Sequence, residues 1–264
     1  MMRENHWEYA LITGGSRGLG RALAEELARR GVPTLLVGTS ETVLRVCEDI
    51  ADTYHVPSVG FVADLTRREE VRTLAEAVNG EYELCMLINN AGVGGSQRFE
   101  EASEEYIDNI LQLNVCCTAL LTRLLLPNLM RRERGYILNI GSMSACTPTA
   151  FKTVYPASKS FVRAFSIGLR EELRSTPVTV SVALPGAIAT NAEVSERIHR
   201  QGFWGRATLK SPAAIAHRCV DGMLKGRRQV ILNPLAYLLC KIVPECVRVP
   251  LLSRIVRREV GGSR

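Results

Sequence analysis

The fold of this chain can be predicted from residues 9–20, which read YALITGGSRGLG. They begin with an apolar run typical of a buried strand and end in a glycine-rich turn. Apolar residues then recur with helical spacing as far as Gly31. Because a turn without side chains lets a pyrophosphate approach the backbone at a helix N-terminus, this stretch indicates a dinucleotide site. An ordinary turn between a strand and a helix is the alternative.

Segments with strand and helix patterns alternate along the rest of the chain. Six further apolar runs are typical of buried strands, at residues 33–38, 59–63, 84–88, 136–140, 179–184 and 229–232. Strands that alternate with helices form a parallel sheet with right-handed crossovers, and ligands bind at the carboxyl ends of its strands. We therefore predict an α/β fold, a Rossmann-like doubly wound parallel β-sheet flanked by helices.

The length and composition fit one large domain with an extension. With 264 residues, of which 46% are hydrophobic, the chain can bury a sizeable core. We expect a single domain at residues 1–232 and an amphipathic, basic extension at residues 233–264. Within the extension, apolar and basic side chains alternate over residues 235–258. These residues suit a membrane surface or a hydrophobic substrate, or else packing on the body or on a second subunit.

Charge and cysteine content bear on the partners and the cellular compartment of the protein. The net charge of +6 suits an anionic ligand or surface, but the aromatic content of 6% shows no nucleic-acid pattern, so we expect no nucleic-acid partner. The eight cysteines form no CxxC motif and no histidine lies at zinc-ligand spacing, so we expect no metal. We predict a cytoplasmic protein. The cysteines are expected to be reduced thiols, the N-terminus does not resemble a signal peptide, and no run reaches about 18 apolar residues. A peripheral contact with a membrane surface through residues 235–258 is compatible with this prediction.

Tyr155 and Lys159 are the strongest candidates for chemistry. Spaced four apart on a predicted helix, they lie on one face, one turn from each other. A fixed ammonium favours phenolate and lowers the pKa of a tyrosine, which can then exchange protons with a substrate oxygen. Ser142 follows the predicted strand at residues 136–140, where it can hold a carbonyl oxygen beside that tyrosine. Two unrelated surface residues would show the same Tyr–Lys spacing.

Other polar residues follow the third and fourth predicted strands. Asp64 either binds an adenine amino group or starts a loop. The fourth strand runs into Asn89-Asn90-Ala91-Gly92, where small and amide residues suit close backbone approach and buried hydrogen bonds. We expect Asn89 to stabilise the fold, and Asn90 and Gly92 to contact a cofactor.

Asn114 interrupts the apolar side of a long helix predicted at residues 104–131. A buried amide needs hydrogen-bond partners. Asn114 is therefore either a structural cap for a neighbouring backbone or part of a proton path.

The end of the second predicted strand bears on the choice of cofactor. An acidic residue there usually holds the ribose hydroxyls of NAD, but this chain has Gly38. Arg17 in the glycine turn can meet a 2′-phosphate, and Thr39 and Ser40 can add hydroxyl donors. We therefore favour NADP(H) over NAD(H). The alternative is that Arg17 is merely a solvated charge in the loop.

Together these motifs resemble those of the short-chain dehydrogenase/reductase family in its compact, single-domain form. The resemblance extends from Ala10 to about Thr190 and keeps the family's order. It rests on TGxxxGxG at residues 13–20, Asp64, NNAG at residues 89–92, Asn114, Ser142, YxxxK at residues 155–159 and Pro185-Gly186.

The resemblance implies an NADP(H)-dependent oxidoreductase that reduces a ketone or aldehyde, or oxidises the secondary alcohol. Tyr155 would be the general acid or base, Lys159 would lower its pKa and hold the nicotinamide ribose, and Ser142 would orient the substrate oxygen. Asn114 would support a water path to solvent. The implied cofactor contacts are Gly14, Ser16, Arg17, Gly18, Leu19, Gly20, Thr39, Ser40, Asp64, Leu65, Asn90, Ala91, Gly92, Tyr155, Lys159, Pro185, Gly186, Ile188 and Thr190.

Substrate and assembly are predicted from weaker features. The apolar extension, Phe203 and Trp204 favour a hydrophobic substrate, and residues 191–210 form either a substrate lid or a variable loop. The resemblance and the apolar faces of the two long helices predict a homo-oligomer. The alternative function is a non-catalytic dinucleotide-binding regulator or scaffold of the same fold, although such a protein has no need of the complete catalytic set.

Overall fold

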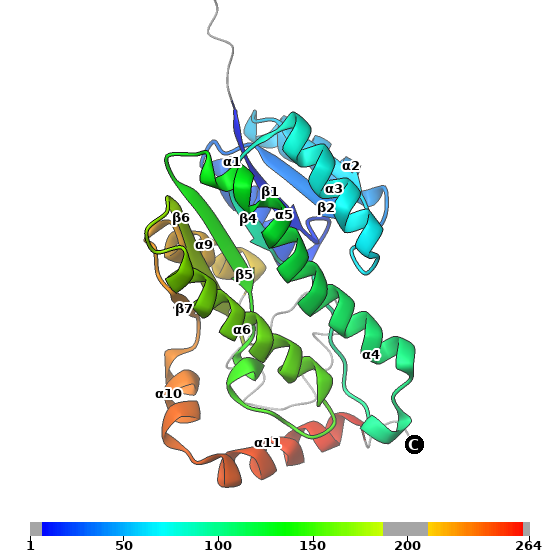
Figure 1. Ribbon diagram of the computed structural model, residues 1–264. Coiled ribbons are helices and arrows are strands. Elements are labelled where there is room, and N and C mark those ends of the chain that lie inside the picture. Colours follow the sequence, from blue (N-terminus) through cyan, green and yellow to red (C-terminus); the bar gives the residue numbers. More distant parts are fainter. Residues whose placement is uncertain (1–6, 187–210, 261–264) are drawn as a thin grey trace, which may run out of the picture.

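The structure is a computed structural model that describes residues 7–186 and 211–260, with side chains as far as Arg257. A parallel sheet of seven strands in the order β3-β2-β1-β4-β5-β6-β7 forms its centre (Figure 1). The strands are β1 Glu8–Thr13, β2 Thr34–Gly38, β3 Ser58–Val62, β4 Glu83–Asn89, β5 Gly135–Ile140, β6 Val178–Leu184 and β7 Gln229–Ile231. The predicted doubly wound fold is confirmed.

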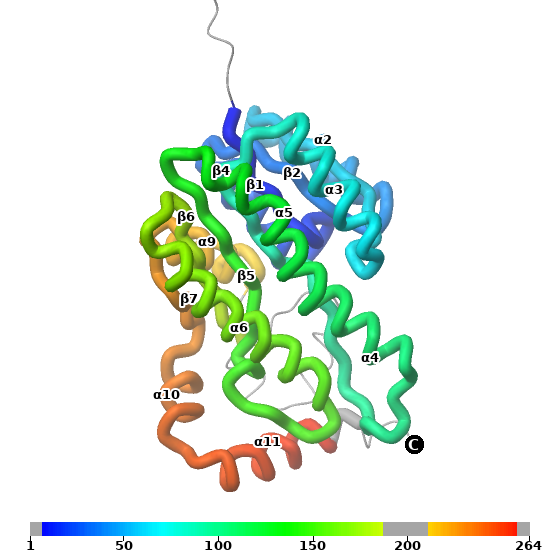
Figure 2. The backbone as a smooth tube through the Cα atoms, viewed as in Figure 1, coloured from blue at the N-terminus to red at the C-terminus, as the bar shows by residue number. Residues whose placement is uncertain are grey.

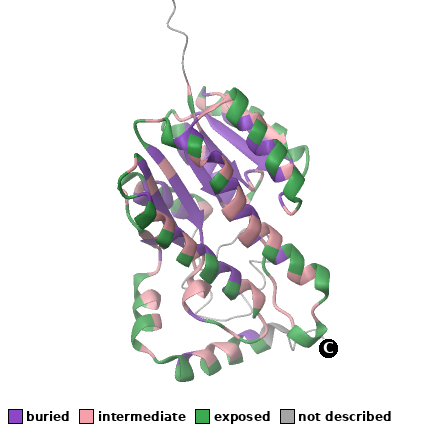
Figure 3. Ribbon diagram, in the orientation of Figure 1, coloured by how far each residue is buried: buried purple, intermediate pink, exposed green. Residues whose placement is uncertain are grey.

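Helices cover both faces of the sheet. One face packs against α1 (Gly18–Arg29), α2 (Thr42–Tyr54) and α9 (Pro212–Leu224). The other packs against α3 (Arg68–Glu81), α5 (Thr118–Met130) and the C-terminal part of α6 (Val154–Glu172). Because successive strand residues point to opposite faces and both faces are covered, the strands are almost continuously apolar. Most of their residues are buried (Figure 3).

The strand order reverses at β1. This strand pairs with β2 on one side and β4 on the other, so that Ile12 lies between Leu36 and Ile88. Connections from β1 and β4 leave to opposite faces at such a point, and the crevice between them is where ligands bind in this kind of sheet. The glycine turn after β1 and the NNAG motif after β4 therefore meet at the predicted site.

The helix predicted at residues 104–131 has three parts. These are α4 (Glu104–Leu111), a π-helical segment (Gln112–Cys117) that contains Asn114, and α5. Apolar spacing did not reveal the π segment, because one wider turn hardly changes the pattern. Among the described residues, Glu104–Met130 is the one helix long and apolar enough to span a membrane, but several of its side chains belong to the core of this domain.

Two further helices follow the last strand. α10 (Pro234–Ile242) and α11 (Glu245–Val260) leave the sheet and turn beneath the N-terminal end of α6 (Figures 1 and 2). This C-terminal arm matches the amphipathic extension expected from the sequence. The domain boundary at residue 232 stays a prediction.

Candidate active site

The glycine turn after β1 depends on residues without side chains. Gly14 and Gly18 have φ values of 67° and 58°, in the left-handed region. A Cβ atom at Gly20 would collide with the carbonyl group of Gly14, so α1 packs directly on the turn. The side chain of Arg17, at the N-cap, does not cap α1. The first N–H groups of this helix therefore suit the pyrophosphate of a dinucleotide.

Asn90 holds the glycine turn against the end of β4. Its side-chain amide donates to the carbonyl oxygens of Thr13 at 2.9 Å and Gly14 at 3.2 Å. The backbone amides of Asn90 and Ala91 donate to the Thr13 hydroxyl at 3.0 and 2.9 Å. Asn90, which we predicted to contact the cofactor, therefore stabilises the glycine turn. A direct contact between Asn90 and the cofactor stays a prediction.

Asn89 belongs to a buried network behind the site. Its amide donates to Thr122 at 3.0 Å and to Asn139 at 2.7 Å, and Asn139 donates to Ser166 at 2.9 Å. The network joins β4 and β5 to α5 and α6. It agrees with the structural role expected for Asn89.

Exposed polar side chains surround the ends of β1 and β2. Arg17, Thr39 and Ser40 are all exposed. A Cβ atom at Gly38 would lie 3.0 Å from the Cβ of Val43 and 3.5 Å from that of Ser16, so Ser16 is adjacent to the end of β2. This corner offers a guanidinium and hydroxyl groups, which suit a phosphate on a bound ribose.

Asp64, after β3, starts a loop. Its carboxylate accepts hydrogen bonds from the backbone amide of Thr66 at 3.0 Å and from the Thr66 hydroxyl at 2.7 Å. This is one of the two predicted roles, and the adenine contact stays a prediction. Leu65 beside it is buried.

Ser142 lies directly after β5 and accepts two hydrogen bonds from Ser144. They come from the backbone amide at 3.1 Å and the hydroxyl at 2.8 Å. Tyr155 is partly buried, and burial raises the pKa of its phenol, which hydrogen bonds with Ser142 and Ser144 only partly offset. The three hydroxyl groups therefore form one cluster at the carboxyl end of β5.

Lys159 is buried next to this cluster of hydroxyl groups. It is 5% exposed, and burial lowers the pKa of its ammonium to about 8. Its Nζ atom donates to the carbonyl oxygen of Ile140 at 3.0 Å and lies 6.0 Å from the centroid of the Tyr155 ring. We expected the lysine to lower the pKa of Tyr155, but that pKa is raised, because loss of hydration outweighs the favourable interactions of the phenol.

Asn114 fastens the loop after β4 to the start of α6. It is 1% exposed, and its amide accepts from the N–H of Val93 and donates to the carbonyl of Val93, both at 2.9 Å. It also donates to Ser158 at 2.9 Å, which in turn donates to the carbonyl oxygen of Tyr155 at 2.8 Å. The side chain thus caps a neighbouring backbone, one of its two predicted roles, while the proton path stays a prediction.

Glycines in the same loop approach the catalytic side chains. A Cβ atom at Gly92 would lie 3.1 Å from Lys159 Nζ, and one at Gly94 would lie 2.8 Å from the Tyr155 ring. Sequence reasoning found Gly92 but missed Gly94 and Ser144. Two patterns could have indicated them: the first glycine after NNAG, and the second serine of the turn after β5.

The end of β6 borders the same site. The backbone amide of Met143 donates to the carbonyl oxygen of Pro185 at 2.8 Å, which places Pro185 and Gly186 close to Ser142. Ile188, Thr190 and residues 191–210, including Phe203 and Trp204, lie outside the described residues. Within residues 7–186 and 211–257, no group of three His, Cys, Asp or Glu side chains could hold a metal ion.

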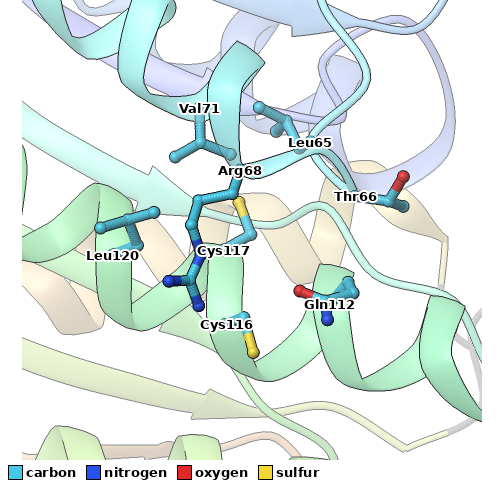
Figure 4. Close-up of a pocket in the computed structure, with 8 residues that line it drawn as sticks. All are labelled: Leu65, Thr66, Arg68, Val71, Gln112, Cys116, Cys117 and Leu120. Carbon is cyan, nitrogen blue, oxygen red and sulfur yellow. The ribbon is translucent and has the colours of Figure 1, made fainter.

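A small hollow lies between α3 and the π segment (Figure 4). Its empty space, which includes open solvent, is about 180 Å³, less than the roughly 300 Å³ at which ligand pockets begin. None of the predicted catalytic residues lines it. Its lining residues are Leu65, Thr66, Arg68, Val71, Gln112, Cys116, Cys117 and Leu120.

Comparison with known proteins identifies the family of this chain. The family model described as short chain dehydrogenase matches residues 8–201, and the chain belongs to that family. It is 30% identical to the human "Inactive hydroxysteroid dehydrogenase-like protein 1" over 264 residues, which cover 97% of this chain and 79% of that protein.

Two further relatives have names or titles that describe active enzymes or a bound cofactor. The chain is 35% identical over 187 residues to the "Very-long-chain 3-oxoacyl-CoA reductase" of Anas platyrhynchos, covering 69% of this chain and 60% of that protein. A short-chain dehydrogenase from Sphingobium yanoikuyae, solved with NADPH, shares the fold with a TM-score of 0.76 and 27% identity, covering 93% of this chain and 95% of that one.

Proposed function

We propose that this protein is an NADP(H)-dependent oxidoreductase that reduces the ketone or aldehyde group of a hydrophobic substrate, or oxidises the corresponding secondary alcohol. One observation carries the proposal. The hydroxyl groups of Ser142, Ser144 and Tyr155 cluster at the carboxyl end of β5, one helical turn from the buried Lys159. This arrangement can hold a carbonyl oxygen and give it a proton.

The raised pKa of Tyr155 suits the reductive direction. Near neutral pH the phenol keeps its proton and can donate it to the carbonyl oxygen that Ser142 orients. When bound, the nicotinamide supplies or accepts the hydride. Lys159, when protonated, holds the nicotinamide ribose and stabilises the phenolate that remains after proton transfer. In the oxidative direction the phenolate takes the proton of the alcohol.

The preference for NADP(H) is supported by the corner at the ends of β1 and β2. Arg17 and the hydroxyl groups of Thr39 and Ser40 are exposed there, and Gly38 replaces an acidic residue. A cation favours a 2′-phosphate, whereas a carboxylate would repel it.

A hydrophobic substrate is supported by the names of the relatives. One name refers to a very-long-chain oxoacyl group and the other to hydroxysteroids, and both are largely apolar. The exposed leucines of the C-terminal arm fit the same class of substrate.

A second candidate is a non-catalytic dinucleotide-binding regulator. It is favoured by the relative whose name calls it inactive and which aligns with 97% of this chain. This chain keeps Ser142, Tyr155 and Lys159, clustered as catalysis requires, so we rank the enzyme first.

The test is NADPH oxidation by the purified protein with a panel of ketones: a long-chain 3-oxoacyl-CoA, a ketosteroid and a small polar ketone. We expect turnover of the apolar substrates, reduced at least about 100-fold in Tyr155→Phe because the proton donor is missing. NADPH binding without turnover of any ketone would favour the regulator. Preference for the small polar ketone would contradict the hydrophobic substrate.

We also propose a cytoplasmic homo-oligomer. Apolar Leu111 on α4 and Phe161 on α6 are exposed at 39% and 37%, and Phe161 stacks on Phe165 with ring centroids 5.7 Å apart. All eight cysteines are free, which supports a reducing compartment. Light scattering of wild type and Phe161→Glu tests the oligomer, and cell fractionation tests the compartment.

A further inference from the structure

The C-terminal arm, α10 and α11, carries a stripe of exposed apolar side chains. On α10 the stripe consists of Leu235, Leu238, Leu239 and Ile242, at positions i, i+3, i+4 and i+7, with exposed fractions of 51–68%. On α11 it continues with Val247, Leu251 and Ile255, spaced four apart and 37–56% exposed. Such spacing places each set on one side of its helix.

The opposite side of the arm is attached to the body. Tyr237 packs against the small core cluster of α6 and β6, and Arg248 and Val256 are both 8% exposed. Ser253 accepts a hydrogen bond from the backbone amide of Ala150 at 2.9 Å. The arm is therefore docked through one side, and the residues of its apolar stripe are exposed. Figure 3 shows in green the exposed residues of the arm.

The charges beside the stripe are almost all positive. Lys241, Arg254 and Arg257 are exposed. The single acidic residue of residues 234–257, Glu245, lies 3.0 Å from Arg248 in an ion pair. An outward apolar face bordered by cations matches the apolar interior and anionic head groups of a lipid surface.

We propose that the apolar stripe of the C-terminal arm docks on an anionic lipid surface, with the arm lying in the plane of the bilayer interface. A second copy of the chain fits the stripe less well, because the centre of a protein interface is depleted of charge and cations on both copies would repel. Docking does not depend on the proposed hydride-transfer activity.

Docking would bring the catalytic loop to the lipid surface. The loop that follows Ser142 contacts the arm at Thr147, whose hydroxyl donates to Cys240, and at Phe151, whose ring lies 5.7 Å from the guanidinium carbon of Arg257. An apolar substrate dissolved in the bilayer would then reach the site without crossing water. This consequence alone rests on the proposed function.

Sedimentation with vesicles tests the docking without any activity measurement. The full chain is mixed with vesicles of phosphatidylcholine alone and with vesicles that also contain phosphatidylserine. We expect binding to the anionic vesicles, weakened by salt, and at least tenfold weaker binding to the neutral ones. In Leu235→Gln/Leu239→Gln, binding should fall at least tenfold, and Lys241→Gln/Arg254→Gln should lose most of the preference for anionic vesicles.

A matched control is Leu224→Gln, an exposed leucine of α9 outside the arm, which should bind vesicles like the wild type. Thermal unfolding and NADPH titration of each variant establish that the body is folded. Absence of vesicle binding, or binding that the leucine variant leaves unchanged, overturns the proposal. If the leucine variant instead turns an oligomer into monomers while no form binds vesicles, the stripe is an interface between copies.

Discussion

The Nζ atom of Lys159 donates a hydrogen bond to the carbonyl oxygen of Ile140 at 3.0 Å. Ile140 is the last residue of β5, and Ser142 follows two positions later. The bond thus joins the helix that carries Tyr155 to the strand whose end carries Ser142. In this position the ammonium is buried, and the burial lowers its pKa to about 8.

Lys159→Met should change how stability depends on pH. The pKa of Lys159 in the folded chain, about 8, lies below its ordinary value of 10.5, so between these values the unfolded chain binds more protons. The free energy of unfolding of the wild type, relative to the variant, should therefore rise with pH by roughly 3 kcal/mol over this range. Urea unfolding without cofactor, from about pH 7 to about pH 10.5, measures it.

The exposed Lys225 provides the control for this experiment, because Lys225→Met removes an amine that is not buried in the folded chain. A difference between wild type and Lys159→Met that stays constant with pH would contradict the burial of a charged lysine.

Ser144→Ala should slow the reaction without unfolding the protein. Its hydroxyl donates to Ser142 and shares the hydrogen-bond cluster of Tyr155. Loss of about one neutral hydrogen bond, roughly 1 kcal/mol, predicts a fall in kcat of about fivefold. Ser160→Ala, which removes an exposed hydroxyl bonded to the carbonyl of Ala145, is the matched control. Equal kcat values for the two variants would show that Ser144 has no role in positioning.

Arg17→Ala should weaken NADPH binding while leaving NADH binding nearly unchanged. The guanidinium at the start of α1 is exposed, and a charge-assisted bond to phosphate is worth about 1.5–3 kcal/mol. Fluorescence titration should therefore show a loss of roughly tenfold to a hundredfold for NADPH. Tighter binding of NADH by the wild type would instead reverse the proposed preference.

Gly20→Ala should damage the cofactor site, whereas Gly168→Ala should not. Both glycines lie in helices, but a Cβ atom at Gly20 collides with the backbone of Gly14, while one at Gly168 meets nothing within 4 Å. Alanine at Gly168 should stabilise α6 by roughly 0.5–1 kcal/mol. Thermal unfolding and NADPH titration of the two variants make the comparison. Unimpaired NADPH binding by Gly20→Ala would contradict the close packing of the turn.

The sequence by itself determined the parallel sheet and the place of the site. Apolar runs that alternate with helical patterns are local features, and they predict a parallel sheet because strands buried on both faces need helices on both sides. The residues after β1, β4 and β5 meet because the carboxyl ends of parallel strands share one edge. The positions of Tyr155 and Lys159 on one helical face likewise follow from their spacing.

Only the tertiary structure decided how these residues interact. The raised pKa of Tyr155 and the lowered pKa of Lys159 come from loss of hydration, which depends on every neighbouring element and not on the four-residue spacing. The bonds of Asn90 to the glycine turn and of Asn114 to Val93 join segments far apart in the chain. Such long-range contacts leave no local pattern, so they were decided by packing alone.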